Sequence, residues 1–255
     1  MGKIINNKRL PSFLIIGAEK AGTTSVSTIL NSQKSIFIPK VKEVHFFSIY
    51  WDNHLEWYEN FFPQSNKHIL GEASPSYTVY PKVKNVPKRI YKTIPEARLL
   101  YVIRNPIDRF ISHYRHALYN NWLPNNCDID ESIKRLPQLI HTGKYYFQIK
   151  QNLEFFDKKQ IKVICIEDLN ENPKNFIDIF RFIGLENSQP TKIKRKNVTN
   201  EKFFVPNYLN LLRKNKYIRS IAGGYHGEGL LINRFYNGMK LFSRKKVPFP
   251  AISID

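Results

Sequence analysis

The segment Gly17–Thr24, which reads GAEKAGTT, combines two glycines, a lysine and two threonines. Glycines allow backbone N–H groups to converge on an anion, and a helix N-terminus adds about half a positive charge. The segment fits the nucleotide-binding pattern G-x4-G-K-[ST], except that Thr23 stands in the lysine position and the lysine is Lys20. We therefore predict an anion site without the usual phosphate lysine. The alternative is a plain strand–helix turn with a solvated lysine.

Arg104 and Ser112 form a second group whose chemistry suits an anion. Arg104 directly follows the apolar run Leu99–Ile103, and Ser112 lies eight residues beyond Arg104. An arginine binds phosphate through two parallel hydrogen bonds, and a serine hydroxyl adds another donor. No apolar run of the chain ends in an aspartate that would hold Mg²⁺ beside a nucleotide. We expect a second phosphate contact here; the alternative is that Arg104 caps a helix.

Short apolar runs alternate with helical patterns and must position both groups. The runs predict buried strands at Phe13–Ile16, Ile69–Glu72, Leu99–Ile103 and Ile161–Ile166. Helices are predicted from Thr23 to Leu30, from Pro106 to about Asn120, and from Pro173 to Gly184. This alternation predicts an α/β fold with a central parallel sheet flanked by helices. Such sheets present ligand contacts at the carboxyl ends of their strands, where both groups lie.

The chain has 255 residues and a formal net charge of +19, from 40 lysines and arginines against 21 aspartates and glutamates. This excess indicates an anionic partner, such as nucleic acid, a membrane surface, an acidic glycan or a phosphorylated cofactor, unless it reflects composition alone. Two cysteines, Cys127 and Cys165, exclude a disulfide framework and a cysteine-only zinc site, and Cys165 is expected to be buried. No run reaches the roughly 20 apolar residues of a membrane span, and the N-terminus lacks an apolar signal core, so we expect a cytoplasmic protein.

Two further groups of side chains have more than one interpretation. His113 and His116 lie three residues apart on a predicted helix, but no third ligand is evident, so we expect surface or packing roles and no metal site. Trp51, Trp57 and Tyr58 either line a cleft for an acceptor molecule or pack in the core.

Taken together, these segments resemble the sulfotransferases that use 3′-phosphoadenosine 5′-phosphosulfate (PAPS), and most closely the heparan-sulfate-type branch and its bacterial relatives. The residues that carry the resemblance are, in chain order, Lys20–Ser25, Lys42–Phe47, Gly71–Tyr77, Tyr101–Ser112, Ile164–Leu169 and Phe182–Leu185. The resemblance implies a P-loop-like sulfotransferase fold in a single domain over residues 1–255. Its core would span residues 11–185, and residues 186–255 would form a basic loop and a helical C-terminal part.

The resemblance also implies how the cofactor is held. Lys20 would contact the bridging oxygen and the leaving 5′-phosphate. Arg104 and Ser112 would hold the 3′-phosphate, which distinguishes this cofactor from ordinary adenine nucleotides. Lys194–Lys196 is a candidate for a late cofactor loop. The remaining residues that would hold the 5′-phosphosulfate are Ala21, Gly22, Thr23, Thr24 and Ser25.

The catalytic residues that the resemblance implies are Lys20, Glu43 as the general base, and His45 as a neighbouring active-site group. Glu43 and His45 are two residues apart, so in an extended segment both side chains point the same way and either can face the acceptor. The chain departs from the heparan-type branch at Ala73, where those enzymes commonly have lysine. The missing cation counts against an acidic glycan as the acceptor.

The expected activity is therefore transfer of the sulfuryl group of PAPS to a hydroxyl or amine of a glycan or small molecule, with no metal and with 3′-phosphoadenosine 5′-phosphate (PAP) as the product. Two alternatives remain open: a P-loop-type nucleotide kinase, and a non-enzymatic nucleic-acid-binding protein, which the net charge suggests. The lysines are spread along the chain apart from a cluster at Lys192–Lys202, so nucleic acid is the less expected partner. The acceptor, the choice of oxygen or nitrogen, and the oligomeric state are not determined at this level.

Overall fold

The computed structural model describes residues 9–41, 43–64 and 69–186. The chain divides into two compact units. The first, which we call the sheet unit, comprises the described residues up to Arg109 together with those from Ile140 onward. The second unit comprises Phe110–Leu139 among the described residues. The predicted single domain over the whole chain stays a prediction, and the proposed basic loop and helical C-terminal part lie outside the described residues.

The described part of the sheet unit contains a five-stranded parallel sheet in the order β2-β3-β1-β4-β5. The strands are β1 (Phe13–Gly17), β2 (Ile36–Phe37), β3 (Ile69–Ala73), β4 (Arg98–Ile103) and β5 (Ile161–Cys165). The predicted α/β class and parallel sheet are thus confirmed. Because β3 and β4 flank β1, the loops after these three strands all emerge at one edge of the sheet.

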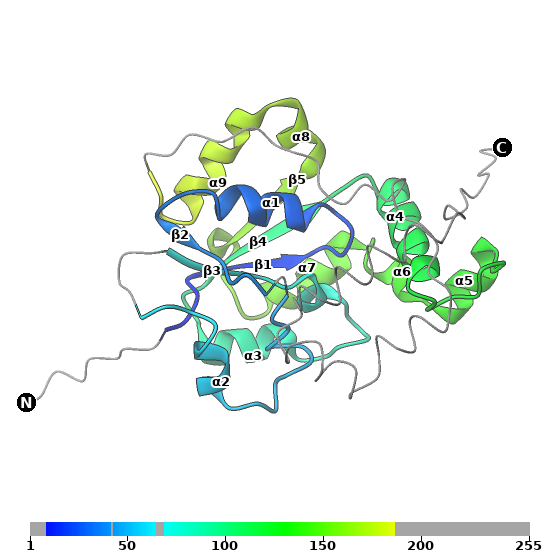
Figure 1. Ribbon diagram of the computed structural model, residues 1–255, viewed down its shortest axis with the longest axis horizontal. Coiled ribbons are helices and arrows are strands. Elements are labelled where there is room, and N and C mark those ends of the chain that lie inside the picture. Colours follow the sequence, from blue (N-terminus) through cyan, green and yellow to red (C-terminus); the bar gives the residue numbers. More distant parts are fainter. Residues whose placement is uncertain (1–8, 42, 65–68, 187–255) are drawn as a thin grey trace, which may run out of the picture. The chain divides into compact units, whose positions relative to one another are not determined.

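Helices connect the strands on both sides of the sheet. They are α1 (Thr23–Leu30), α2 (Leu55–Glu59), α3 (Val86–Thr93), α4 (Pro106–Tyr119), α5 (Ile129–Arg135), α6 (Gln138–His141), α7 (Tyr145–Leu153), α8 (Ile166–Glu171) and α9 (Phe176–Phe182), with the 3₁₀ turns η1 (Pro75–Thr78), η2 (Lys158–Gln160) and η3 (Pro173–Asn175). In the sheet unit, α1, α8 and α9 lie on one side of the strands, and α2 and α3 lie on the other (Figure 1).

Several predicted boundaries differ from the structure, and β1, β3 and β4 are each one residue longer than predicted. The last strand ends at Cys165, because Ile166 already begins α8. The helix predicted from Pro173 begins as the 3₁₀ turn η3, and α9 itself starts at Phe176. The other two predicted helices, α1 and α4, begin where the sequence placed them.

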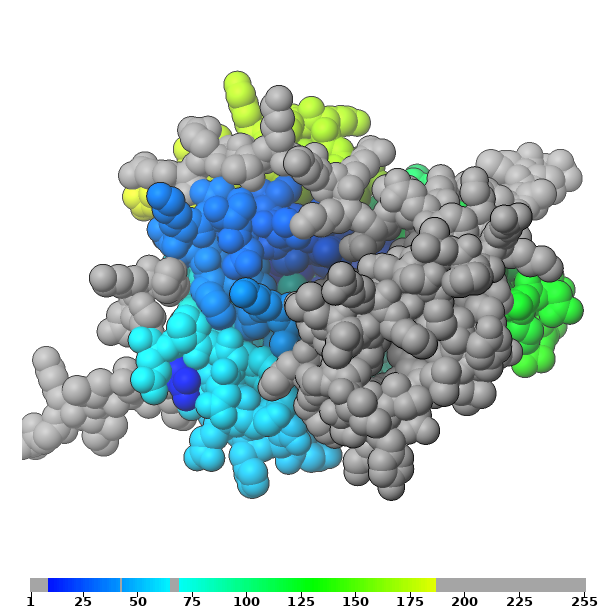
Figure 2. All heavy atoms as spheres, in the orientation of Figure 1, coloured from blue at the N-terminus to red at the C-terminus, as the bar shows by residue number. Residues whose placement is uncertain are grey.

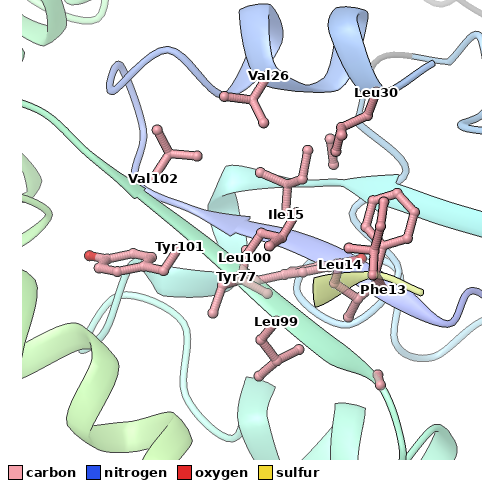
Figure 3. Packing of buried hydrophobic residues seen from close by; sticks show 14 of the residues in the cluster. Phe13, Leu14, Ile15, Val26, Leu30, Tyr77, Leu99, Leu100, Tyr101 and Val102 are labelled. Carbon is pink, nitrogen blue, oxygen red and sulfur yellow. The ribbon is translucent and has the colours of Figure 1, made fainter. Parts of the chain in front are cut away.

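The core of the sheet unit forms where β1 is covered on both faces. All five residues of β1 are buried, and Val26 and Leu30 of α1 point toward Ile15 from one side (Figure 3). A Cβ atom on Gly71 of β3 would lie 2.0 Å from Cζ of Phe13, so the glycine makes room for this ring. Each fully buried apolar side chain of this kind stabilises the fold by about 1.5–3 kcal/mol. The expectation of a strand apolar on both faces is confirmed.

The second unit has a smaller apolar cluster of its own. Its buried members are Tyr114, Ala117, Leu118, Leu123, Cys127 and Leu139. The hydroxyl of Tyr114 donates to the carbonyl of Cys127 at 2.6 Å, and the side chain of Asp128 caps α5 by accepting from the N–H of Glu131 at 2.7 Å. His113 is buried in this unit, which favours a packing role.

Candidate active site

The loop between β1 and α1 leads into the helix without a side chain that caps the helix N-terminus. Lys20 has φ 67° and Gly22 has φ 97°, both in the left-handed region. Gly22 is the N-cap of α1, no side chain caps this terminus, and the first turn carries no acidic residue. The first N–H groups of a helix have no intrahelical acceptor, so this arrangement suits an anion. The anion site stays a prediction, which the left-handed backbone and the uncapped start of α1 support.

Both glycines of this loop are needed for close approach. A Cβ atom on Gly17 would lie 1.8 Å from Oγ1 of Thr78, and this Oγ1 donates to the carbonyl of Ile16 at 2.8 Å. A Cβ atom on Gly22 would lie 2.8 Å from Cγ1 of Ile166, at the start of α8. The loop is therefore packed tightly against η1 on one side and α8 on the other.

Arg104 follows β4, and two other elements of the sheet unit hold the main chain at Arg104 and Asn105. The hydroxyl of Tyr145 on α7 donates to the carbonyl of Arg104 at 2.6 Å and accepts from its N–H at 3.4 Å. Oε1 of Glu167 on α8 accepts from the N–H of Asn105 at 3.1 Å. The guanidinium of Arg104 lies 3.4 Å from the carboxylate of Asp108. Sequence reasoning missed this clamp of Tyr145 and Glu167, since no local pattern pairs them with β4.

Glu167 is also the partner of a cysteine. Partial burial acts to raise the pKa of Glu167, but the hydrogen bonds from Asn105 and Cys165 and the charge of Arg104 outweigh it and lower the pKa. The thiol of Cys165 donates to Oε2 of Glu167 at 3.1 Å and is half-buried rather than fully buried as expected. The cysteine is therefore a polar partner of the clamp and not a core side chain.

Ser112 lies on α4 beyond Arg109 and belongs to the second unit. Its predicted pairing with Arg104 over one phosphate stays a prediction. The candidate cofactor loop Lys194–Lys196 lies outside the described residues.

Glu43 and His45 contact each other directly. Oε2 of Glu43 lies 3.3 Å from Nε2 of His45, and the side chains are 31% and 22% exposed, respectively. His45 has φ 58°, and its carbonyl accepts from the N–H groups of Ser48, Ile49 and Tyr50. The segment is not extended at His45, where the chain turns sharply. The carboxylate of Glu43 and the imidazole of His45 therefore contact each other.

A buried carboxylate, Glu72 of β3, lies behind this turn. It accepts hydrogen bonds from the hydroxyls of Tyr58, Ser74 at 2.5 Å and Tyr77 at 2.6 Å. The Ser74 oxygen also accepts from the N–H of His45 at 3.0 Å. Burial raises the pKa of Glu72, and these three hydroxyls act against that rise. The network therefore connects the end of β3 to the backbone of the turn that carries the Glu43–His45 pair.

Sequence reasoning gave Glu72 no role, although one signal was present: it is an acidic residue inside an apolar strand. Such a residue needs buried partners, and it finds them in two tyrosines and a serine. Burial and the negative charge of Glu72 raise the pKa values of Tyr58 and Tyr77, so both remain hydrogen-bond donors.

The aromatic residues near this turn pack on one another. The rings of Phe46 and Tyr58 stack with centroids 4.4 Å apart, and Trp51 and Trp57 contact the ring of Phe46. The guanidinium of Arg89 lies 5.3 Å from the centroid of Trp51. Of the two interpretations of these aromatics, the structure supports core packing, and Tyr58 has no exposed surface with which to line a cleft.

The anion loop and the Glu43 segment influence each other electrostatically. Partial burial raises the pKa of Glu19, and the negative charge of Glu43 raises it further, whereas the charges of Lys82, Lys20 and Arg109 lower it. The chain around α1, in blue, and the chain around α2, in cyan, also lie next to one another on one face (Figure 2). The charges of Lys20 and Glu43 thus both act on the carboxylate of Glu19.

Neither a metal centre nor a membrane span emerges from the part of the chain that the structure describes. Within residues 9–41, 43–64 and 69–186, no three His, Cys, Asp or Glu side chains are grouped so as to hold a metal ion. No helix among these residues is both long and apolar enough to cross a membrane.

A parallel sheet whose first strand leads through a glycine loop into a helix is the arrangement found in α/β proteins that bind phosphorylated ligands at that edge. The sulfotransferase domain family matches residues 10–223, so the chain belongs to this family. This is the family that the sequence motifs resemble. Family membership favours a sulfotransferase over the two alternatives, the nucleotide kinase and the nucleic-acid-binding protein.

Several curated sulfotransferases are similar to the chain. The membrane-associated sulfotransferase kil1 of Dictyostelium discoideum is 34% identical over 121 residues, which cover 46% of this chain and 25% of kil1. The human heparan sulfate glucosamine 3-O-sulfotransferase 5 is 27% identical over 209 residues, which cover 75% of this chain and 57% of the human protein. The matched part of the chain therefore spans between a quarter and a little over half of these relatives.

Solved structures support the fold. A sulfotransferase from Alicyclobacillus acidocaldarius superposes with a TM-score of 0.64 at 24% identity, over 89% of this chain and 96% of the other. The sulfotransferase domain of the curacin biosynthetic pathway superposes with a TM-score of 0.54 at 14% identity, over 71% and 76% of the two chains. The predicted sulfotransferase fold is confirmed.

Proposed function

We propose that this sulfotransferase uses PAPS as its donor, transfers the sulfuryl group to a hydroxyl or amine of a glycan or small molecule, and uses Glu43 as the general base. The observation that carries the proposal is the Glu43–His45 contact of 3.3 Å, in a segment whose charge acts on the loop of Lys20. A general base must lie close to the site of the donor, so that it can take the proton of an acceptor bound beside the donor. A carboxylate next to the anion loop meets this requirement.

The reaction is an in-line displacement at sulfur. The acceptor oxygen or nitrogen forms a bond to sulfur while the bond from sulfur to the bridging phosphate oxygen breaks, and the acceptor's proton passes to Glu43. Negative charge develops on the leaving 5′-phosphate, where Lys20 and the N-terminus of α1 stabilise it. Arg104 is the contact proposed for the 3′-phosphate; Tyr145 holds its main chain, and Glu167 holds that of the neighbouring Asn105.

The acceptor class follows from one similarity and one departure. The name of the similar heparan sulfate glucosamine 3-O-sulfotransferase 5 states a glycan acceptor, and this similarity supports a glycan acceptor here. Ala73 ends β3 as a buried apolar residue, so it adds no cation for an acidic sugar. We therefore propose a glycan of lower charge than heparan, or a small molecule, as the acceptor.

The proposal is tested by incubating the protein with PAPS and panels of glycans, sugars and small alcohols or amines. We expect PAP release and a mass gain of one sulfuryl group on one acceptor class. Glu43→Gln should lower turnover about a hundredfold, because it removes the base but keeps the shape, while PAP affinity changes by less than about threefold. Glu96→Gln, at an exposed site, is the matched control and should retain turnover.

Two outcomes would overturn parts of the proposal. Near-normal turnover of Glu43→Gln beside an inactive His45→Ala variant would move the base to His45. A ligand that binds the folded state raises the melting temperature. If neither PAPS nor PAP raises the melting temperature of the wild-type protein, this donor is excluded.

A further inference from the structure

Both ring nitrogens of His45 have a partner. Nε2 lies 3.3 Å from Oε2 of Glu43, and Nδ1 lies 2.7 Å from Oγ of Ser76. Oγ of Ser76 in turn lies 2.7 Å from Oγ of Ser48. Ser76 belongs to η1, which follows β3, and Ser48 belongs to the turn after His45. The imidazole is therefore held at both edges by groups from different parts of the chain.

The chemistry of these groups determines where the proton of a neutral ring lies. An ionised carboxylate only accepts hydrogen bonds, so Nε2 must carry a proton if it is to bond to Glu43. In a neutral imidazole the other nitrogen, Nδ1, is then an acceptor. Ser76 must donate its hydroxyl proton to Nδ1, and its oxygen is left to accept the proton of Ser48. The donors run in one direction, from Ser48 through Ser76 and His45 to Glu43.

We propose that Ser76 is a positioning residue for the transfer reaction: its hydroxyl fixes the tautomer of His45 so that Nε2–H points at Glu43 and orients that carboxylate. The order carboxylate, imidazole, hydroxyl is also that of a hydrolase triad. Ser76 is only 8% exposed and its oxygen is engaged by Ser48, so it orients the ring and does not attack a substrate. The step from orientation to catalysis rests on the proposed role of Glu43.

Loss of the Ser76 hydroxyl would act through the ring. Without a donor at Nδ1, the hydrogen bond that favours the tautomer with the proton on Nε2 is lost. The tautomer with the proton on Nδ1 places a nitrogen lone pair against the carboxylate of Glu43, and the two groups repel. The carboxylate then loses the bond that orients it, while the anion loop around Lys20 is untouched.

The first test needs no substrate. Nitrogen-15 NMR of the histidine-labelled wild-type protein, at a pH at which the ring is neutral, reports which ring nitrogen of His45 carries the proton, with His45→Gln used for assignment. We expect the proton on Nε2. A proton on Nδ1 overturns the proposal, whether or not the protein transfers sulfuryl groups.

The second test uses variants. Ser76→Ala should give a tautomer mixture and about a tenfold lower kcat with PAP affinity unchanged, because only the orientation of the base is affected. Ser76→Thr retains the hydroxyl and should restore both readouts. Ser12→Ala, at an exposed serine, is the matched control. A Ser76→Ala protein that keeps the wild-type tautomer and kcat overturns the proposal. A failed donor or acceptor assay contradicts only the proposed function, since the NMR result stands alone.

Discussion

The anion loop, Gly17–Thr24, and the base segment, Glu43–Ser48, are built by opposite means. The loop is shaped mainly through its backbone, with left-handed residues at Lys20 and Gly22, a helix that starts directly after them, and glycines that allow close packing against η1 and α8. The base segment takes its shape from partners far along the chain, since Glu72, Ser74 and Ser76 hold it through hydrogen bonds.

Under the proposed function, this difference follows from what each region would bind. A phosphosulfate is the same ligand for every acceptor, and main-chain N–H groups suit it whatever the neighbouring side chains are. The base must instead meet one particular acceptor atom, and its direction is set by side chains that hold the ring and the carboxylate. The loop should therefore respond to changes in backbone freedom, and the base segment to the loss of single hydroxyl or carboxyl groups.

The largest effect is expected at the buried end of the base network. Glu72→Ala leaves three buried hydroxyls without their acceptor, each loss worth about 1–3 kcal/mol, so the free energy of unfolding should fall by about 4 kcal/mol. Urea denaturation measures this change. Glu96→Ala, at an exposed site, should change it by less than about 0.5 kcal/mol. Equal losses for the two variants would show that the network does not support the fold.

Lys20 tests whether the anion loop contributes to chemistry as well as to binding. Lys20→Ala should lower kcat about a hundredfold, because its contact strengthens as negative charge develops on the leaving phosphate. Steady-state kinetics separate the two contributions. If KM for PAPS rises while kcat is intact, Lys20 serves ground-state binding alone. Lys34→Ala, at an exposed lysine, is the control and should leave both constants unchanged.

Arg104 tests the contact proposed for the 3′-phosphate. Arg104→Ala should weaken PAP binding tenfold to a hundredfold, the equivalent of about 1.5–3 kcal/mol for a charge-assisted contact. Binding of adenosine 5′-phosphosulfate, which lacks that phosphate, should hardly change. Isothermal titration with both ligands decides the question, and equal losses would make the role of Arg104 structural. Arg181→Ala, at an exposed arginine, is the control.

The smallest effect, and the most direct test of backbone control, comes from two glycines with nearly equal φ. Gly22→Ala and Gly184→Ala place a side chain at φ 97° and 93°, respectively, so both variants carry a similar strain of about 1–2 kcal/mol. Gly22→Ala should weaken PAP binding about tenfold, because the loop must shift from Ile166. Gly184→Ala should leave PAP binding unchanged. If the Gly22→Ala and Gly184→Ala variants bind PAP with equal affinity, the loop tolerates the backbone strain at residue 22.

Much of the fold followed from local patterns. Phe13–Ile16 is apolar on both faces of a strand and is found in the centre of the sheet, because only a strand covered on both sides buries all of its residues. The start of α1 at Thr23 followed from the glycine before it. The two-residue strand β2 had no such pattern, since its length is too short to show alternation.

The sequence by itself indicated the family, the strands of the parallel sheet and the glycine loop, because each motif, each strand and this loop consists of residues that are close together in the chain. Only the tertiary structure decided how Glu43 and His45 are held. His45 meets Ser74 and Ser76 across 29 and 31 residues, and Arg104 meets Tyr145 across 41. A hydrogen bond between residues so far apart depends on the register of the strands and on the direction of each loop, and no local pattern carries either.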